Sequence, residues 1–202
     1  MQDNDLYYSI ETEQSYEIKV KGSKFIATAI PVSNKEEALK EKKRIAEKYF
    51  DASHNTYAYR IGFNGLEFRY SDDGEPNGTA GKPILFAIQK HNLSDILVVV
   101  TRYFGGVKLG VGGLSRAYYE SANNVLLQCK KKKVFLTIEI IIFTLYEDLA
   151  NIKRILSEYA ILFSENYRDI VEINASIPQT KVEELEKKII DISRGRAGIK
   201  VI

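Results

Sequence analysis

Residues 96–125 read ILVVVTRYFGGVKLGVGGLSRAYYESANNV and join a buried strand, a glycine-rich segment and a helix. The continuous apolar run 96–100 predicts a central strand that is covered on both faces. A helix is predicted from about Leu114, because apolar and small side chains recur along one side of it. A strand that leads directly into a helix indicates that the larger part of the chain mixes α and β structure.

The glycine-rich segment, residues 101–116, carries the basic side chains Arg102, Lys108 and Arg116. Glycine lets backbone amides approach a ligand closely, and the N-terminus of a helix favours an anion. The segment could therefore hold phosphate groups, or it could be a tight reversal without a ligand, and the spacing favours neither. It has neither the Gly-Lys-Ser/Thr ending of a Walker loop nor the G-x-G-x-x-G dinucleotide pattern. The candidate residues for binding an anion or a nucleic acid are Arg102, Tyr103, Gly105, Gly106, Lys108, Gly112, Gly113 and Arg116.

A second loop, SDDGEPNGTAGKP at residues 71–83, places three carboxylates within four residues. Asp72, Asp73 and Glu75 could hold a hard cation such as Mg²⁺ or contact a basic partner. The alternative, which the spacing favours, is a solvated turn, where Asp and Gly are common because their backbones tolerate unusual angles. We therefore predict no metal site and no cofactor, and we keep the three residues as a candidate acidic loop. Pro83 suits the first turn of the helix that follows.

The remainder of the first part alternates strands with one helix. Residues 16–30 read as one long strand, or as two strands that separate at Gly22. Asn34 is a suitable N-cap for a helix in the residues that follow it. Strand-like runs flank Asn64-Gly65, a dipeptide that strongly favours a hairpin turn.

A run of four lysines at 130–133 is the best candidate for a domain boundary, since like charges in a row suit an exposed connection or a helix end. The residues after it predict, in chain order, strand 136–143, helix 149–159, strands 162–167 and 170–177, helix 182–192 and strand 199–201. The order βαββαβ is that of a ferredoxin-like two-layer sandwich. We therefore predict one domain at residues 1–132 and a smaller domain at residues 133–202.

The composition is that of an ordinary folded protein, with 45% hydrophobic and 28% charged residues among 202 and a formal net charge of +2. This balance excludes a strongly basic nucleic-acid-binding protein, so a phosphate backbone would have to meet a local patch. No apolar run approaches the roughly 18 residues of a membrane helix, and the first residues do not resemble a signal peptide. We expect a cytoplasmic protein without a membrane partner. His54, His91 and Cys129 are too few and too scattered for a zinc site.

Several motifs of the first part, in order and over about residues 16–128, resemble the Impact family and in particular its bacterial YigZ-like group. The matching segments are KFI at 24–26, ASH at 52–54 with YAYR at 57–60, SDDGEP at 71–76 with GTAGKP at 78–83, and TRYFGGVKLG at 101–110. The second part is similar to the second domain of the bacterial members, which resembles the last domain of elongation factor G.

The resemblance implies an α+β protein. Its first domain would have the fold of the second domain of ribosomal protein S5, and its second domain would be the small ferredoxin-like one. Eukaryotic relatives act in translational control by binding a regulator of a stress-responsive kinase. The bacterial members resemble non-catalytic proteins with a link to RNA, the ribosome or translation factors.

Two hypotheses about function follow. The first, which we prefer, is a non-catalytic binding protein linked to translation regulation, which contacts RNA, the ribosome or a translation-factor protein through the glycine-rich basic loop. The second is a Mg²⁺-dependent enzyme acting on a nucleotide or a phosphorylated small molecule, because small-molecule kinases that share the S5-like fold use a glycine-rich loop before a helix. Asp72, Asp73 or Glu75 would then bind the metal or act as a base. The sequence leaves the oligomeric state open.

Overall fold

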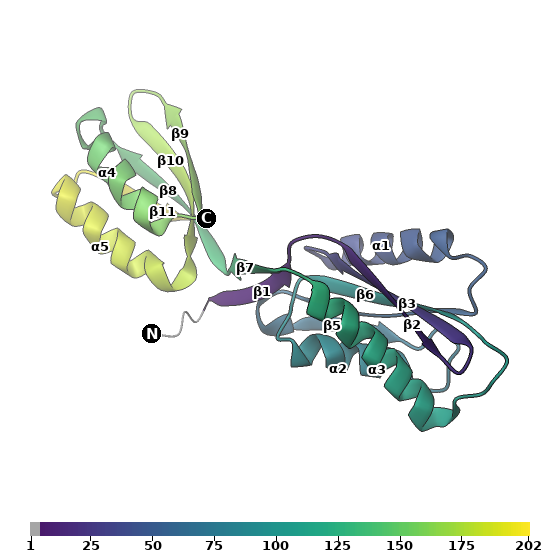
Figure 1. The fold of residues 1–202 in the computed structure, drawn as a ribbon. Coiled ribbons are helices and arrows are strands. Elements are labelled where there is room, and N and C mark those ends of the chain that lie inside the picture. Colours follow the sequence, from purple (N-terminus) through teal and green to yellow (C-terminus); the bar gives the residue numbers. More distant parts are fainter. Residues whose placement is uncertain (1–4) are drawn as a thin grey trace. The chain divides into compact units, whose positions relative to one another are not determined.

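The computed structural model describes residues 5–202, which form two compact units (Figure 1). The larger unit is Tyr7–Val134, and the smaller one comprises Asp5, Leu6 and Phe135–Ile202. Both units mix helices with strands, which confirms the predicted α+β class. Among the described residues, no helix has the length and apolar character that crossing a membrane requires.

A five-stranded antiparallel sheet forms the centre of the larger unit. Its third strand, β6, lies in the middle, and seven of its eight residues are buried, as predicted from the apolar run at 96–100. The strands, in their order across the sheet, are β2 (Gln14–Val20), β3 (Ser23–Pro31), β6 (Ile96–Tyr103), β4 (His54–Ile61) and β5 (Glu67–Ser71).

Three helices cover the two faces of this sheet. Helix α1 (Lys35–Lys48) lies on one face, and α2 (Gly81–Lys90) and α3 (Gly110–Gln128) lie on the other (Figure 1). Because side chains alternate along a strand, Val98 and Val100 of β6 belong to the core under α2 and α3, whereas its intervening residues belong to the core under α1. Each fully buried side chain of this size contributes about 1.5–3 kcal/mol.

Most of the local structures that the sequence predicts in the first part are present. Asn34 caps α1, since its side chain accepts a hydrogen bond from the Glu37 amide. Residues 16–30 form two strands rather than one, and the reversal between them lies at Lys21 and Gly22, which both have positive φ. Asn64-Gly65 does lie between paired strands, but within a short 3₁₀ turn, η1 (Phe63–Gly65), rather than in a two-residue hairpin turn.

Helix α3 begins at Gly110, four residues before the predicted start. Glycine is a poor helix former, so the sequence pattern conceals this first turn. As a result, only residues 104–109 connect β6 to α3, and the other part of the glycine-rich segment is helical.

The smaller unit has the predicted βαββαβ order. Its strands pair in the order β11-β8-β10-β9, all neighbours being antiparallel, and both helices lie on one face of the sheet (Figure 1). The elements are β8 (Thr137–Thr144), α4 (Tyr146–Tyr159), β9 (Leu162–Tyr167), β10 (Val171–Pro178), α5 (Val182–Ser193) and β11 (Gly198–Val201). This arrangement is the ferredoxin-like sandwich.

Two further strands, β1 (Leu6–Ile10) and β7 (Lys131–Phe135), form a two-stranded sheet that the sequence does not predict. The sequence predicts an exposed connection or a helix end at the four lysines, but three of them lie in β7. Their side chains are nevertheless exposed, as like charges in a row require. A strand whose side chains stay in water lacks the alternation by which a strand is recognised.

The connection between β6 and α3 is held against the turn between β2 and β3. A Cβ atom built on Gly105 would lie 1.9 Å from the carbonyl carbon of Gly22 and 2.2 Å from the Ser23 amide nitrogen. These neighbours are backbone atoms, which cannot move aside as a flexible side chain does. Only glycine therefore fits at position 105.

We predict that Gly105→Ala lowers the free energy of unfolding by about 2–3 kcal/mol, because the added methyl group forces two backbone segments apart. Urea unfolding followed by circular dichroism measures the effect. Gly112→Ala is the matched control: it meets nothing within 4 Å and has no positive φ, so it should be neutral or stabilising by up to about 1 kcal/mol. Equal losses in the two variants would contradict the close packing at Gly105.

Candidate functional site

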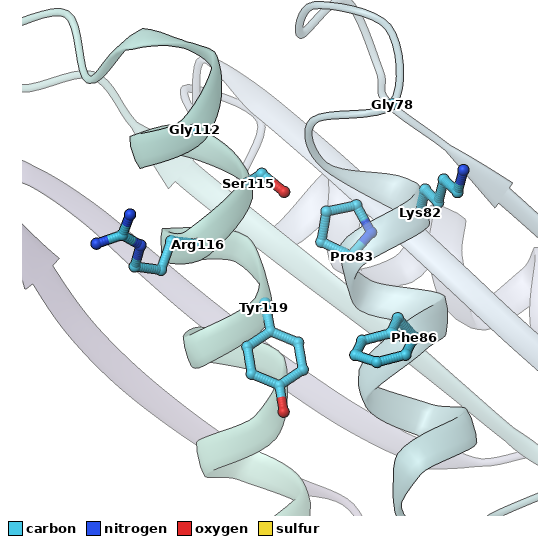
Figure 2. Close-up of a pocket in the computed structure, with 8 residues that line it drawn as sticks. All are labelled: Gly78, Lys82, Pro83, Phe86, Gly112, Ser115, Arg116 and Tyr119. Atoms are coloured by element: carbon cyan, nitrogen blue, oxygen red, sulfur yellow. The ribbon is translucent and has the colours of Figure 1, made fainter.

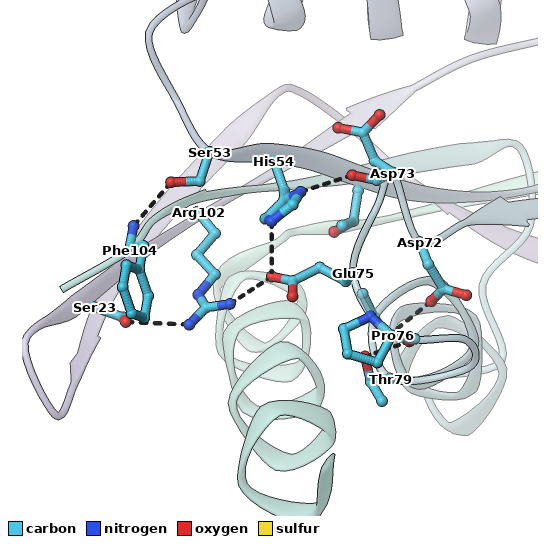
Figure 3. A network of polar contacts seen from close by, with 12 residues as sticks. Ser23, Ser53, His54, Asp72, Asp73, Glu75, Pro76, Thr79, Arg102 and Phe104 are labelled. Atoms are coloured by element: carbon cyan, nitrogen blue, oxygen red, sulfur yellow. Dashed lines mark hydrogen bonds and ion pairs between the residues drawn. The ribbon is translucent and has the colours of Figure 1, made fainter. Parts of the chain in front are cut away.

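A buried ion pair joins the two loops that the sequence singles out (Figure 3). Arg102, near the end of β6, donates a hydrogen bond from Nη1 to Oε1 of Glu75 at 2.7 Å, and both side chains are buried. The Nη2 group of Arg102 donates to the Ser23 hydroxyl at 3.4 Å, while its buried Nε has no protein partner. The charge of Arg102 is therefore neutralised inside the unit.

Two more side chains converge on the same oxygen of Glu75. The hydroxyl of Tyr118, from α3, donates to Oε1 at 2.7 Å, and Nε2 of His54, the first residue of β4, lies 3.8 Å from it. Burial, together with the hydrogen bond to Glu75, raises the pKa of Tyr118 far above its ordinary value, so the phenol stays protonated and donates. Nδ1 of His54 donates to the carbonyl oxygen of Asp73 at 2.7 Å.

The first residues after β6 are also tied to their surroundings. The Phe104 amide donates to the Ser53 hydroxyl and the Gly105 amide to the Ser23 hydroxyl, each at 3.1 Å. The guanidinium carbon of Arg102 lies 5.4 Å from the ring centre of Phe104, which is close enough for a cation–π contact. The start of the glycine-rich connection is thus fixed by side-chain and backbone contacts.

The acidic loop is a hydrogen-bonded turn. Asp72 accepts hydrogen bonds from the amides of Gly78, Ala80 and Gly81 at 2.8–2.9 Å, which caps the N-terminus of α2. The Asp73 carboxylate accepts from the Asn55 amide at 2.6 Å. Because Glu75 is occupied as well, all three carboxylates have internal partners. Within residues 5–202, no group of three or more His, Cys, Asp or Glu side chains could hold a metal ion.

A groove of about 480 Å³, which we call the α2–α3 groove, separates the second and third helices (Figure 2). Phe86 of α2 and Tyr119 of α3 project into it, and their ring centres are 5.8 Å apart. Lys82 and Arg116 extend away from it, one on each side, so a cation flanks each rim. The lining residues are Gly78, Lys82, Pro83, Phe86, Gly112, Ser115, Arg116 and Tyr119.

A second pocket, of about 350 Å³, is formed by both loops together. Glu75 and Arg102 contribute to it, as do Lys108 and the first residues of α3. Among the described residues, no side chain caps the N-terminus of α3, whereas Asp72 accepts from the amides at the start of α2. The acidic and glycine-rich loops therefore line one cleft.

The other predicted residues lie in different surroundings. Tyr103 does not share the site with Arg102, because its hydroxyl donates to Asp51 at 2.7 Å and Lys24 lies over its ring at 4.5 Å. Gly105 is a packing position, and Gly106 is exposed with a positive φ. Lys108 and Arg116 are exposed and form no ion pair with any carboxylate among residues 5–202, and Gly112 and Gly113 lie in the first turn of α3.

Sequence reasoning misses three members of the buried network: Ser23, His54 and Tyr118. The period of α3 indicates correctly that Tyr118 faces the sheet, but periodicity cannot indicate which polar group its hydroxyl meets. For His54, the position in the ASH segment is the only signal that could have associated it with the loops. Ser23 follows a turn and carries no recognisable motif.

Comparison with protein families finds two matches along the chain. The model of the Impact N-terminal domain matches residues 21–126. A second model, described as a domain of unknown function (DUF1949), matches residues 145–196. The first match includes β3, β6 and both loops of the candidate site.

Individual relatives align over nearly the whole chain. The Impact family member YvyE of Bacillus subtilis is 34% identical over 200 residues, which is 96% of this chain and 90% of that protein. The member YigZ of Escherichia coli is 32% identical and covers 88% of both chains. A solved structure titled as that of a hypothetical protein superposes with a TM-score of 0.73 at 29% identity, over 98% of each chain.

We predict that Arg102→Met lowers the free energy of unfolding by about 3–5 kcal/mol, because the carboxylate of Glu75 stays buried without its cation. The double variant Glu75→Gln/Arg102→Met should recover at least half of the loss, since no buried charge remains. Urea unfolding measures both. Arg44→Met, which removes an exposed guanidinium paired with Glu13 and Glu41, is the control and should cost less than about 1 kcal/mol. A similar small loss for Arg102→Met would refute the structural role.

Cys129 is expected to be unreactive in the native protein, since burial raises the pKa of its thiol to about 11. The thiolate is the reactive form, so labelling by 5,5′-dithiobis(2-nitrobenzoate) should be slow at pH 7 and accelerate about tenfold per pH unit below pH 11. The urea-unfolded chain, which exposes the thiol, should react at the rate of a free cysteine. Rapid stoichiometric labelling of the native protein at pH 7 would show that Cys129 is accessible.

Proposed function

Because this chain belongs to the Impact family, we propose that it is a non-catalytic, cytoplasmic binding protein with a role linked to translation regulation, and that the α2–α3 groove contacts RNA. One observation carries the proposal: a groove with two aromatic side chains inside it has a cation at each rim. An unpaired base and the phosphates on either side of it match this arrangement in chemistry and order.

The aromatic part of the groove suits an unstacked base. Phe86 is exposed although it is apolar, and it is tilted by 40° against Tyr119 rather than closed onto it. A volume of about 480 Å³ accommodates a base with its sugar. Stacking of a base on an aromatic side chain contributes about 1–3 kcal/mol and is tolerant of sequence.

The charged part of the site suits the phosphates. Lys82, Lys108 and Arg116 are exposed and have no carboxylate partner among the described residues, so their charges are available to a ligand. Arg102 is not a member of this set, because Glu75 already neutralises it. The exposed first turn of α3 adds backbone amides that no side chain caps, and such amides favour an anion.

The enzyme hypothesis gains no support from residues 5–202. The carboxylates of Asp72, Asp73 and Glu75 hold the α2 N-terminus, a backbone amide and the Arg102 guanidinium respectively. Binding Mg²⁺ with them would leave these buried or half-buried groups without partners, at a cost of about 1–3 kcal/mol each. Their internal use therefore supports a structural role for the loop.

The test measures binding to ribosomes and to structured RNA at several salt concentrations. The triple variant Lys82→Ala/Lys108→Ala/Arg116→Ala should lower the slope of log affinity against log salt by about two to three, because each lost phosphate contact removes nearly one counterion. Phe86→Ala should weaken binding by about tenfold and leave the slope unchanged, because it removes an exposed stacking surface that holds no charged side chain.

The matched control removes three exposed lysines from α1, on the opposite face of the sheet: Lys35→Ala/Lys40→Ala/Lys43→Ala. It has the same net charge as Lys82→Ala/Lys108→Ala/Arg116→Ala, and it should bind RNA like the wild type. An equal loss of affinity in the two triple variants would show that only net charge matters, and it would contradict the assignment of the groove. Ribosome binding without binding to purified RNA would assign the groove to a protein partner instead.

A further inference from the structure

The outer edge of β5 is an open sheet edge with an uncovered apolar row. Among the described strands, β5 pairs only with β4, so the backbone groups on its other side have no strand partner. Leu66, Phe68 and Tyr70 are 85%, 53% and 40% exposed. Phe68 and Tyr70 lie on one face of β5, the one that also carries α2 and α3, because Tyr70 stands opposite Ala58 of that core. Leu66 comes directly before the strand and has a helical backbone.

The opposite edge of the same sheet, formed by β2, carries no comparably exposed apolar row. The corresponding row on β2, Tyr16, Ile18 and Val20, packs against the core beneath α2 and α3. Soluble proteins commonly block an open edge with lysine or proline, but residues 66–71, LEFRYS, contain neither. The two edges thus differ in how much apolar side-chain surface they expose and in whether they carry a lysine.

The charges on β5 are complementary to those of a second β5. Glu67 and Arg69 lie on the other face of the strand and flank Phe68. In an antiparallel pair centred on Phe68, Glu67 stands opposite Arg69 of the second copy, and Arg69 opposite its Glu67. Sliding one strand by two residues would instead place Glu67 opposite Glu67 or Arg69 opposite Arg69. Charges of one sign directly opposite each other are destabilising, so only the centred register is favourable.

This register also lets the outward-pointing amide and carbonyl groups of the two strands form hydrogen bonds with each other. An antiparallel pair with Phe68 opposite Phe68 aligns even-numbered residues with even and odd with odd. The residues of β5 whose amide and carbonyl groups point outward therefore meet the outward-pointing residues of the second copy. The same alignment keeps the apolar rows on one face and the charged pairs on the other.

We propose that the protein forms a two-fold symmetric dimer by antiparallel pairing of two β5 strands centred on Phe68. The occupant of the edge is a second copy because the strand is complementary to itself in charge, in apolar side chains and in backbone register. One patch meeting itself is the rule for a two-fold interface. Two short strands bury little area, so the dimer is weak, with a dissociation constant on the order of 10–100 μM.

Sedimentation velocity over a concentration series of about 1 μM to 1 mM tests the proposal. The wild type should dimerise within this range. Glu67→Arg and Arg69→Glu should each weaken association by about tenfold or more, since each creates two like-charge pairs. The double variant Glu67→Arg/Arg69→Glu exchanges the charges and should restore association to within about threefold of the wild type. All of these residues are exposed, so the variants should fold.

Lys43→Glu on α1 is the matched control for Arg69→Glu, because it makes the same change in net charge at an exposed position away from β5. It should dimerise like the wild type. Amide hydrogen exchange provides a second measurement, in which protection of residues 66–71 should rise with protein concentration. A wild type that remains monomeric at about 1 mM overturns the proposal, and the occupant of the β5 edge would then be a strand of another protein. A dimer that the charge exchange fails to restore, or that protects another segment, overturns it too.

Discussion

One oxygen of Glu75 accepts hydrogen bonds from Arg102 and from Tyr118, which are 27 and 43 residues away in the sequence. This shared acceptor connects the acidic loop, the central strand and α3 in a single contact. Removing two charges from water is costly, and the cost is offset only when the geometry is good and the remaining groups are bonded. The ring of Phe104 beside the guanidinium and the serine hydroxyls around the connection supply part of that environment. The position of both loops therefore depends on one buried pair.

The same pair divides the basic residues of the site into two kinds. Arg102 stabilises the loops from inside, where its charge is cancelled, whereas Lys82, Lys108 and Arg116 remain in water. Asp72 has a comparable effect on the helices, because it satisfies the N-terminus of α2 and leaves that of α3 without a side-chain cap. An incoming anion thus meets exposed cations on both helices, but amides without a side-chain cap only at the start of α3. The polar network inside the unit therefore determines which charges and backbone amides remain available at its surface.

The sequence predicts this fold well wherever a period or a turn signal is local. The apolar run at 96–100, the cap at Asn34 and the alternation in the smaller unit correspond to elements within a few residues. It fails where long-range packing overrides local preference, as in the helical turn that begins at Gly110 and in the exposed lysine strand β7. The site shows the same limit. Two loops are visible as motifs, but nothing local indicates that Arg102 turns inward to meet Glu75.

Gly105 in the connection and Gly112 in the first turn of α3 differ in the same way, because one is enclosed by backbone and the other is open. Gly105 is required by packing, since a side chain there would collide with the backbone of the β2–β3 turn. Gly112 is different, because it has ordinary helical geometry and nothing within 4 Å of the place where a Cβ would be. Alanine would stabilise that turn by about 0.5–1 kcal/mol, so neither packing nor conformation explains a glycine here. What a side chain at Gly112 would change is access to the amides of the first turn of α3, at the rim of the α2–α3 groove.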